Sequence, residues 1–224
     1  MHRLRVGDVT LAYDVRGDGP PMVLLHGVGE RASNWDTVRD ALAARFTTYA
    51  VDLRGHGDSD WPGAYGHALI EADVCSLLDA LGLSDVVLVG HSLGGSIGFR
   101  IAAHRPDLVA RLVVEDVIPP WPRKRRIPAR PARELDYDWD AVPTLMGEAS
   151  THDDVAWDEL AQVVAPTLVV SGGAGSHLPV VKVAEVVDLI PDCVIVEINA
   201  GHHIHRRKPA LFLDAVLGWL AARG

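Results

Sequence analysis

Short apolar runs alternate with helix-like patterns along most of this chain, and that alternation restricts the fold more than any other feature. The helix-like pattern is clearest over residues 67–81, where apolar residues recur at three- and four-residue spacing and Gly82 follows as a C-terminal stop. Buried strands that alternate with helices indicate an α/β fold, with a mostly parallel sheet covered on both faces. The runs of strand length are residues 22–26, 47–52, 86–90, 111–116, 167–171 and 194–198.

Two regions depart from this alternation. The segments RLRV (3–6) and TLAYDVR (10–16) predict an antiparallel hairpin at the start of the chain. Residues 117 to about 165 are rich in Pro, Arg, Asp and Trp and show little clean periodicity. Because the strand pattern resumes after them in the same style, we expect a cap-like insertion into a single domain that spans residues 1–224, rather than a linker between two domains.

Composition excludes some classes of function. The chain has 21 basic and 30 acidic residues and a net charge of −9, which argues against nucleic acid as a general partner because phosphate binding needs a basic face. No run of 18 apolar residues predicts a membrane span, and the N-terminus lacks the secretory pattern, so we expect a cytoplasmic protein without a membrane partner. The cysteines, Cys75 and Cys193, form neither a metal spacing nor a disulfide framework, and we expect free thiols.

The stretch VVLVGHSLGGSIGF (86–99) runs from an apolar strand straight into a glycine-rich corner. Its GHSLG segment fits the G-x-S-x-G pattern of a strained strand-to-helix turn. A side chain at Gly90 or Gly94 would collide with the neighbouring backbone. Because glycine has no side chain, the turn can be tight enough to place the Ser92 hydroxyl above the end of the sheet. We interpret Ser92 as a nucleophile; the alternative is a tight glycine turn with an incidental serine.

A serine hydroxyl needs a base within hydrogen-bond reach. The segment NAGHHIH (199–205) follows the last strand pattern, and His202 comes first after the turn at Gly201, which makes it the expected base. His203 is the main alternative and His205 a further neighbour. We expect no metal at these histidines, because the segment lacks a nearby carboxylate or cysteine partner.

Four motifs resemble those of the α/β-hydrolase superfamily and occur in the same order: HGVG (26–29), DLRGHGDSD (52–60), GHSLGG (90–95) and AGHHIHRRKP (200–209). The resemblance covers nearly all of the chain. It implies the α/β-hydrolase fold, with an eight-stranded, mostly parallel sheet and a short cap. It also implies an oxyanion hole formed by the N–H groups of Val28 and Leu93, and it requires no cofactor.

The acid of the triad departs from the common pattern of that superfamily. An aspartate usually follows the strand after the insertion, but the corresponding segment here, SGGAGSHLP (171–179), contains no carboxylate. Some members carry the acid after the strand that follows the nucleophile helix, and this implies Asp116 in VVEDV (113–117). Glu115 faces the other side of a strand by two-residue alternation. Glu115, or a missing or unusual acid, remains an alternative.

Aromatic and apolar residues are candidates for the substrate pocket. Trp35, from the helix expected after the HGVG loop, is a packing residue that also borders the pocket in this interpretation. The insertion contributes Trp121, Trp139 and Met146 as lining candidates. Its basic run RKRR (123–126) predicts attraction of an anionic substrate; the alternative is a solvated loop.

These observations predict a serine hydrolase that cleaves a small to medium carboxylic ester, thioester or lactone through an acyl-enzyme. The expected partner is therefore a small ester-like molecule. A carbon–carbon bond hydrolase or a cofactor-free perhydrolase would use the same triad. A non-catalytic ligand receptor on the same fold is the alternative from another class, since a fold does not settle a function.

Overall fold

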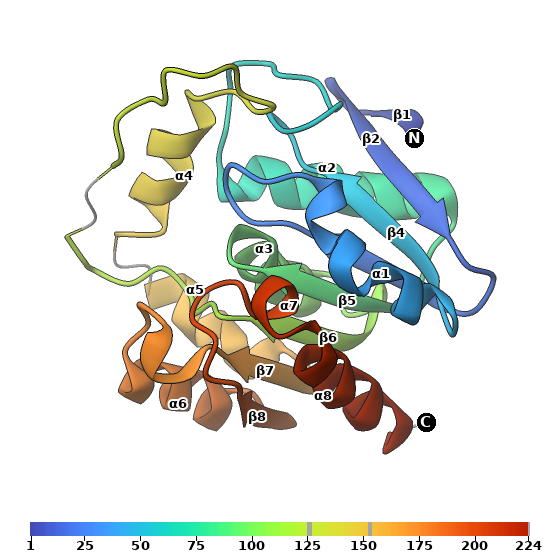
Figure 1. The fold of residues 1–224 in the computed structure, drawn as a ribbon, viewed down its shortest axis with the longest axis vertical. Coiled ribbons are helices and arrows are strands. Elements are labelled where there is room, and N and C mark those ends of the chain that lie inside the picture. Colours follow the sequence, from blue (N-terminus) through green and yellow to red (C-terminus); the bar gives the residue numbers. More distant parts are fainter. Residues whose placement is uncertain (125–126, 152–153, 224) are drawn as a thin grey trace.

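The structure is a computed structural model of the chain. It describes residues 1–124, 127–151 and 154–223. One sheet of eight strands runs through the molecule in the order β1-β2-β4-β3-β5-β6-β7-β8 (Figure 1). The bounds are β1 (His2–Val6), β2 (Val9–Arg16), β3 (Pro21–Leu25), β4 (Thr47–Asp52), β5 (Val86–His91), β6 (Val109–Glu115), β7 (Thr167–Ser171) and β8 (Cys193–Glu197).

The sheet is mostly parallel, which confirms the predicted fold class. β1 and β2 form the expected antiparallel hairpin, and β2 also pairs antiparallel with β4. All the remaining pairs, from β4–β3 to β7–β8, are parallel. The parallel strands β5 and β7 point toward the side of the molecule on which α4 lies (Figure 1). The loops that follow these strands therefore meet at one edge of the sheet, where α/β proteins build their sites.

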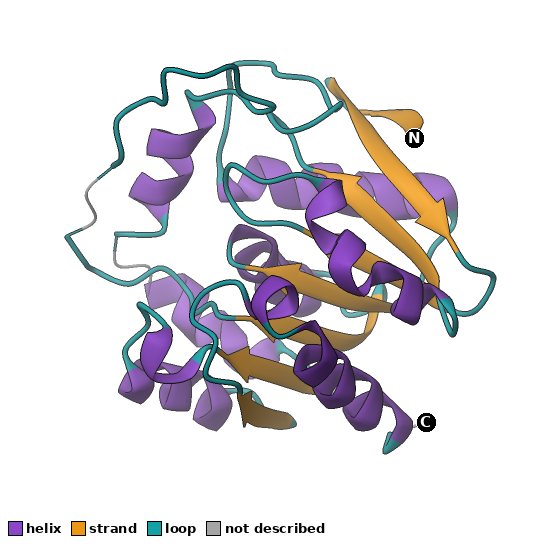
Figure 2. Ribbon diagram, in the orientation of Figure 1, coloured by secondary structure: helices purple, strands orange, loops and turns teal. Residues whose placement is uncertain are grey.

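Helices cover both faces of the sheet (Figure 2). On one face, α2, α3 and α6 pack on side chains such as Leu25 and Leu88, and on the other face α1 and α8 pack on side chains such as Leu24 and Val89. Consecutive strand residues thus bury opposite faces, as expected for a parallel sheet. The helices are α1 (Asp36–Ala43), α2 (His67–Leu81), α3 (Leu93–His104), α4 (Ala141–Glu148), α5 (Asp154–Asp158), α6 (Val180–Leu189), α7 (Ile204–Arg207) and α8 (Pro209–Ala221).

The β6–β7 segment, residues 116–166, corresponds to the predicted insertion and contains α4, α5 and the short 3-10 helix Glu159–Gln162. Hydrogen bonds from Gly57 N to Asp136 O (2.7 Å) and from Asp138 N to Gly55 O (2.7 Å) tie it to the turn after β4. Leu145 of α4 is fully buried, so this helix packs on the body of the protein. Arg125 and Arg126 of the predicted basic run lie outside the described residues.

Within the described residues, no helix combines the length and the apolar character that crossing a membrane would require. Cys75 and Cys193 are both free thiols, as predicted.

Candidate functional site

Ser92 occupies a strained corner between β5 and α3. Its backbone has φ 50° and ψ −112°, in a region that residues with a side chain rarely adopt. A Cβ at Gly90 would lie 2.3 Å from Gly94 O, and one at Gly94 would lie 2.2 Å from Leu25 O. The two glycines therefore allow α3 to pack directly against the ends of β3 and β5, which holds Ser92 in this conformation.

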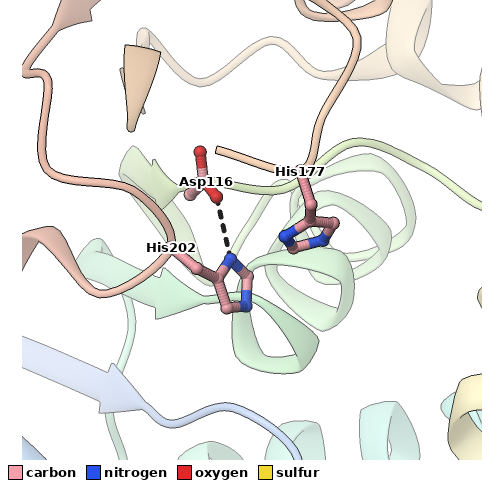
Figure 3. A group of neighbouring side chains, drawn as sticks. All are labelled: Asp116, His177 and His202. Carbon is pink, nitrogen blue, oxygen red and sulfur yellow. Dashed lines mark hydrogen bonds and ion pairs between the residues drawn. The ribbon is translucent and has the colours of Figure 1, made fainter. Parts of the chain in front are cut away.

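His202 and Asp116 come from distant parts of the chain and meet beside this corner (Figure 3). His202 Nδ1 donates to Asp116 Oδ2 at 2.8 Å. Asp116 Oδ2 also accepts from Ser176 Oγ at 2.8 Å, and Asp116 Oδ1 accepts from Gly172 N at 2.9 Å. Burial alone would raise the pKa of Asp116, but these hydrogen bonds, led by that of His202, hold it below its usual value. The carboxylate is therefore ionised and keeps the His202 ring in one orientation.

The pKa of His202 itself lies below its usual value. Burial is the main cause, and the nearby positive charge of His91 acts in the same direction, while Asp116 opposes both. A histidine in this state is neutral at pH 7, with its Nδ1 proton directed at Asp116. Its Nε2 atom then carries a lone pair that can accept a proton.

Two adjoining cavities contain Ser92 and His202. The small inner pocket brings together the five residues expected to act in catalysis, together with apolar side chains of the β6–β7 segment. The outer cleft is wider and is open to solvent. The five residues in the inner pocket are Val28, Ser92, Leu93, Asp116 and His202.

Among the predicted pocket residues, Trp139 and Met146 line the outer cleft. Trp35 does not line either cavity, and its prediction as a pocket wall is wrong: the side chain is fully buried and stacks on His205, with ring centroids 4.4 Å apart. Trp121 is likewise absent from the described lining of both cavities, since its ring packs under Lys182 Nζ of α6 at 4.4 Å. Both tryptophans thus pack within the protein.

The three histidines that follow β8, two in the loop and His205 in α7, each lie beside a different carboxylate. His202 contacts Asp116, His203 Nε2 lies 3.2 Å from Glu30 Oε1, and His205 Nδ1 lies 2.6 Å from Glu115 Oε2. His205 is fully buried on the far side of β6 from Asp116. Of the three, His202 is the one that lines the inner pocket with Ser92.

Glu115 faces away from Asp116, as strand alternation predicts. Its Oε1 accepts from the N–H groups of Ile204 (2.5 Å) and His205 (3.0 Å), at the beginning of α7. Burial would raise the pKa of Glu115, but the positive charge of His91 and the hydrogen bonds of His205 lower it. Glu115 therefore anchors the loop that carries His202.

Glu30 is a residue of the site that the sequence did not single out. Its Oε2 atom accepts from Gly27 N and contacts His91 Nδ1, both at 3.0 Å, while His91 Nε2 contacts the carbonyl oxygen of His202 at 2.8 Å. A carboxylate and a carbonyl can only accept, so His91 donates from both ring nitrogens and is an imidazolium. Burial alone would lower the pKa of His91, but Glu115 and Glu30 raise it to about 9.

His26, unlike His91, is a neutral imidazole. Its Nδ1 donates to Gly27 O at 2.8 Å and its Nε2 accepts from Leu53 N at 3.0 Å, which requires a neutral ring. Complete burial, reinforced by the neighbouring His56, lowers its pKa to about 3. His26 therefore supports the HGVG loop, and neither it nor His91 has a free ring nitrogen for proton transfer.

Asp116, His177 and His202 could together approach a metal ion, because their ligand atoms lie within 4.8 Å of one another (Figure 3). Both oxygens of Asp116, however, already accept hydrogen bonds, and one of those donors is His202. A metal ion held by His202 Nδ1 would have to replace that bond. The donor set therefore fits a hydrogen-bonded acid–base pair better than a metal centre.

Similarity to known proteins agrees with this architecture. A family model described as the α/β hydrolase fold matches residues 20–139. The chain belongs to the α/β hydrolase family. A hydrolase from Pseudomonas aeruginosa superposes with a TM-score of 0.85 and 25% identity, and the match covers 98% of this chain and 97% of that one.

Two sequence relatives show how far the similarity extends. An uncharacterised protein of Mycobacterium tuberculosis is 42% identical over 46% of this chain, but the match spans only 30% of that protein's length. The sn-1-specific diacylglycerol lipase ABHD11 of Mus musculus is 30% identical, and the match covers 98% of this chain and 84% of the lipase. Similarity to a hydrolase thus extends along nearly the whole chain.

Proposed function

We propose that this α/β hydrolase is a serine hydrolase that cleaves a small to medium carboxylic ester, thioester or lactone through an acyl-enzyme. The observation that supports this most is the 2.8 Å contact between His202 Nδ1 and the buried carboxylate of Asp116, in the pocket that also contains Ser92. Similarity to a lipase over 98% of the chain agrees with ester chemistry.

The proposed reaction begins at Ser92. Its Oγ attacks the carbonyl carbon, and its proton passes to His202 Nε2 while Asp116 stabilises the imidazolium that forms. The N–H groups of Val28 and Leu93 hold the negatively charged oxygen, assisted by the N-terminus of α3. When the intermediate collapses, the leaving alcohol takes the proton from His202 Nε2.

Water then repeats the sequence on the acyl-enzyme. His202 removes a proton from the water, the hydroxide adds to the acyl carbonyl, and Ser92 leaves with the returned proton. In this proposal the β6–β7 segment is a short cap, whose Trp139 and Met146 border the substrate in the outer cleft. We further propose that the enzyme works in the cytoplasm, where free thiols such as those of Cys75 and Cys193 persist.

The test combines a 4-nitrophenyl ester panel of increasing acyl length with covalent labelling by a fluorophosphonate. Ser92→Ala is expected to lower kcat by about 10³-fold or more and to abolish labelling, because the oxyanion donors alone retain little rate. The control is Ser96→Ala, one turn further along α3. We expect this variant to be labelled at Ser92, as shown by the mass of the modified peptide. Labelling that persists in Ser92→Ala would overturn the proposal.

A further inference from the structure

The turn at residues 27–30, in and just after the HGVG segment, uses most of its backbone N–H groups within the protein. Gly27 N donates to Glu30 Oε2 at 3.0 Å, and Glu30 N donates to Gly27 O at 3.2 Å. Gly29 N donates to His56 Nε2 at 3.1 Å. In the described part of the chain no group accepts from Val28 N, and Val28 lines both cavities of the site. Of these four amides, that of Val28 is therefore the one that can donate to a substrate.

The shape of this turn depends on the bonds at its two glycines. Gly29 has φ 73°, the positive value that the third residue of a type II turn needs. Because glycine is the least restricted residue, the turn needs further contacts to keep this conformation. The bonds of Gly27 N and Gly29 N lie on either side of Val28. Held on both sides, the Val28 N–H keeps one direction.

His56 is in the state that can accept the bond from Gly29. Its Nδ1 atom lies 2.9 Å from Arg54 O, and a carbonyl oxygen can only accept, so Nδ1 carries the proton. The Nε2 atom then has a lone pair for the N–H of Gly29. The His56 side chain is fully buried, and burial lowers its pKa, so the ring is neutral at pH 7.

The β6–β7 segment covers this contact with a tyrosine. The rings of Tyr137 and His56 stack with centroids 6.0 Å apart, and the two residues also form a β-bridge. The Tyr137 ring lies against Gly29 as well, because a Cβ added there would be 3.3 Å from Tyr137 Cζ. Tyr137 is itself buried. The hydrogen bond between Gly29 and His56 is thus shielded from water, which strengthens it.

We propose, resting on the serine-hydrolase function above, that His56 is a positioning residue for the oxyanion hole. Through its bond to Gly29 N it holds the turn so that Val28 N faces the oxygen on which negative charge develops. His56 is absent from the described lining of both cavities, so it acts through the loop and not on the substrate. Its effect therefore belongs to the transition state, in which that oxygen becomes an anion.

His56→Asn tests this role by removing one bond of the ring. The asparagine amide can still donate to Arg54 O, but it is too short to accept from Gly29 N. We expect kcat on a neutral 4-nitrophenyl ester to fall by about 10- to 100-fold while KM changes by less than about threefold, because losing an oxyanion donor outright costs about 10²- to 10³-fold in kcat. The rate is divided by the number of serines that a fluorophosphonate labels at completion, so unfolded protein does not contribute.

A second measurement reports on the oxyanion hole directly. A trifluoromethyl ketone forms a reversible adduct with Ser92 Oγ, and the ketone oxygen becomes an anion in the hole. We expect this inhibitor to bind His56→Asn more weakly by about the factor lost in kcat. A histidine that only stabilised the fold would leave both values unchanged for each labelled site.

His56→Gln is the conservative variant. Its longer side chain can present Oε1 to Gly29 N in place of Nε2, so it should recover most of the lost rate and of the lost inhibitor affinity. His56→Phe keeps a ring under Tyr137 without any acceptor. It should lose kcat at least as much as His56→Asn does.

The matched control is His104→Phe. His104 lies at the opposite end of α3 from Ser92 and, like His56, contacts a partner with each ring nitrogen. These contacts are Nδ1 to Glu71 Oε1 at 2.5 Å and Nε2 to Glu159 Oε1 at 3.0 Å. His104→Phe should lower the free energy of unfolding, while kcat for each labelled site stays within about twofold of the wild type.

The outcomes separate the two proposals. The role of His56 is overturned by an unchanged kcat in His56→Asn, by a loss that His104→Phe shares, or by a failure of all three His56 variants to be labelled. In each case Ser92-dependent cleavage by the wild type still upholds the hydrolase. Wild-type rates in Ser92→Ala overturn the hydrolase, and the role of His56 with it.

Discussion

Glu115 and Asp116 are chain neighbours with opposite surroundings, and they make a direct comparison of single residues. We predict that Asp116→Asn lowers kcat by about 10³- to 10⁴-fold, because an amide cannot hold the His202 Nδ1 proton and stabilise the imidazolium as a carboxylate does. Steady-state rates on a neutral ester measure this change. Circular dichroism serves as the control that the variant is folded.

For Glu115→Gln we predict a loss of stability as the main effect. The substitution weakens the contacts with the N–H groups of Ile204 and His205 and with His205 Nδ1, and hydrogen bonds to a charged group contribute roughly 1.5–3 kcal/mol each. Urea unfolding measures the change in the free energy of unfolding. A folded Glu115→Gln without activity, beside an active Asp116→Asn, would show that the acid is assigned to the wrong residue.

The sequence allowed Glu115 to be assigned to the other side of the strand, because alternation along a strand is local. It could not reveal Glu30 as the partner of His91, since a charged loop residue has no periodicity and its neighbours depend on how the loops after β3, β5 and β8 meet. Trp35 was misjudged for a related reason. Which face of its short helix packs on α8 is decided only by the tertiary fold.

At the scale of elements, the packing of α3 against β3 depends on Gly94. A Cβ there would lie 2.2 Å from Leu25 O and 2.7 Å from Leu25 Cβ, so the helix would have to move away from the strand. We predict that Gly94→Ala lowers the free energy of unfolding by about 3 kcal/mol or more and lowers kcat as well, because Ser92 immediately precedes this helix. Thermal unfolding and ester hydrolysis measure the two effects.

Gly218→Ala in α8 is the matched control, because no atom lies within 4 Å of its added Cβ. It should raise the free energy of unfolding by about 0.5–1 kcal/mol through helix propensity alone. If Gly94→Ala were as harmless as Gly218→Ala, the close packing of α3 would not be what holds the serine corner.

Some element boundaries were predictable from the apolar pattern alone. Residues 47–52 and 167–171 were predicted as strands and are β4 and β7 to the residue, and α2 ends before Gly82 at φ 65°, as expected. Over residues 117–165 the sequence predicted only an insertion. Its helices α4 and α5 are short and rest on a few buried contacts, so no long apolar period marks them.

At the scale of the whole molecule, His91, the last residue of β5, contacts the loops that follow β3 and β8 and faces the charge of Glu115 at the end of β6. Its imidazolium lies between Glu30, after β3, and Glu115, at the end of β6, and it donates to the carbonyl oxygen of His202, after β8. His26 and the rings of His202, His203 and His205 are the other titratable groups around it. One buried cation thus links the loops that carry every residue of the proposed triad.

The raised pKa of His91, about 9, makes stability depend on pH in a defined direction. A group with a folded pKa above its unfolded value of 6.5 stabilises fully below pH 6.5 and loses that contribution as the pH rises through 9. Glu30 and Glu115 have lowered pKa values, so their contributions change only in acid. We predict that the contribution of His91 to the free energy of unfolding falls by on the order of 3 kcal/mol between pH 6.5 and pH 9.

Glu30→Gln tests whether this pH dependence arises at His91. Without the Glu30 charge, the pKa of His91 should fall toward its ordinary value, so the decline in unfolding free energy should begin at lower pH and be smaller. Urea unfolding at half-unit steps from pH 6 to 9 measures this decline. The two cysteines do not titrate in this range, because the pKa values of Cys75 and Cys193 are raised to about 11 and 12. Exposed Glu134→Gln is the control. If Glu30→Gln and the wild type declined in parallel, the charge on His91 would not be what joins these loops.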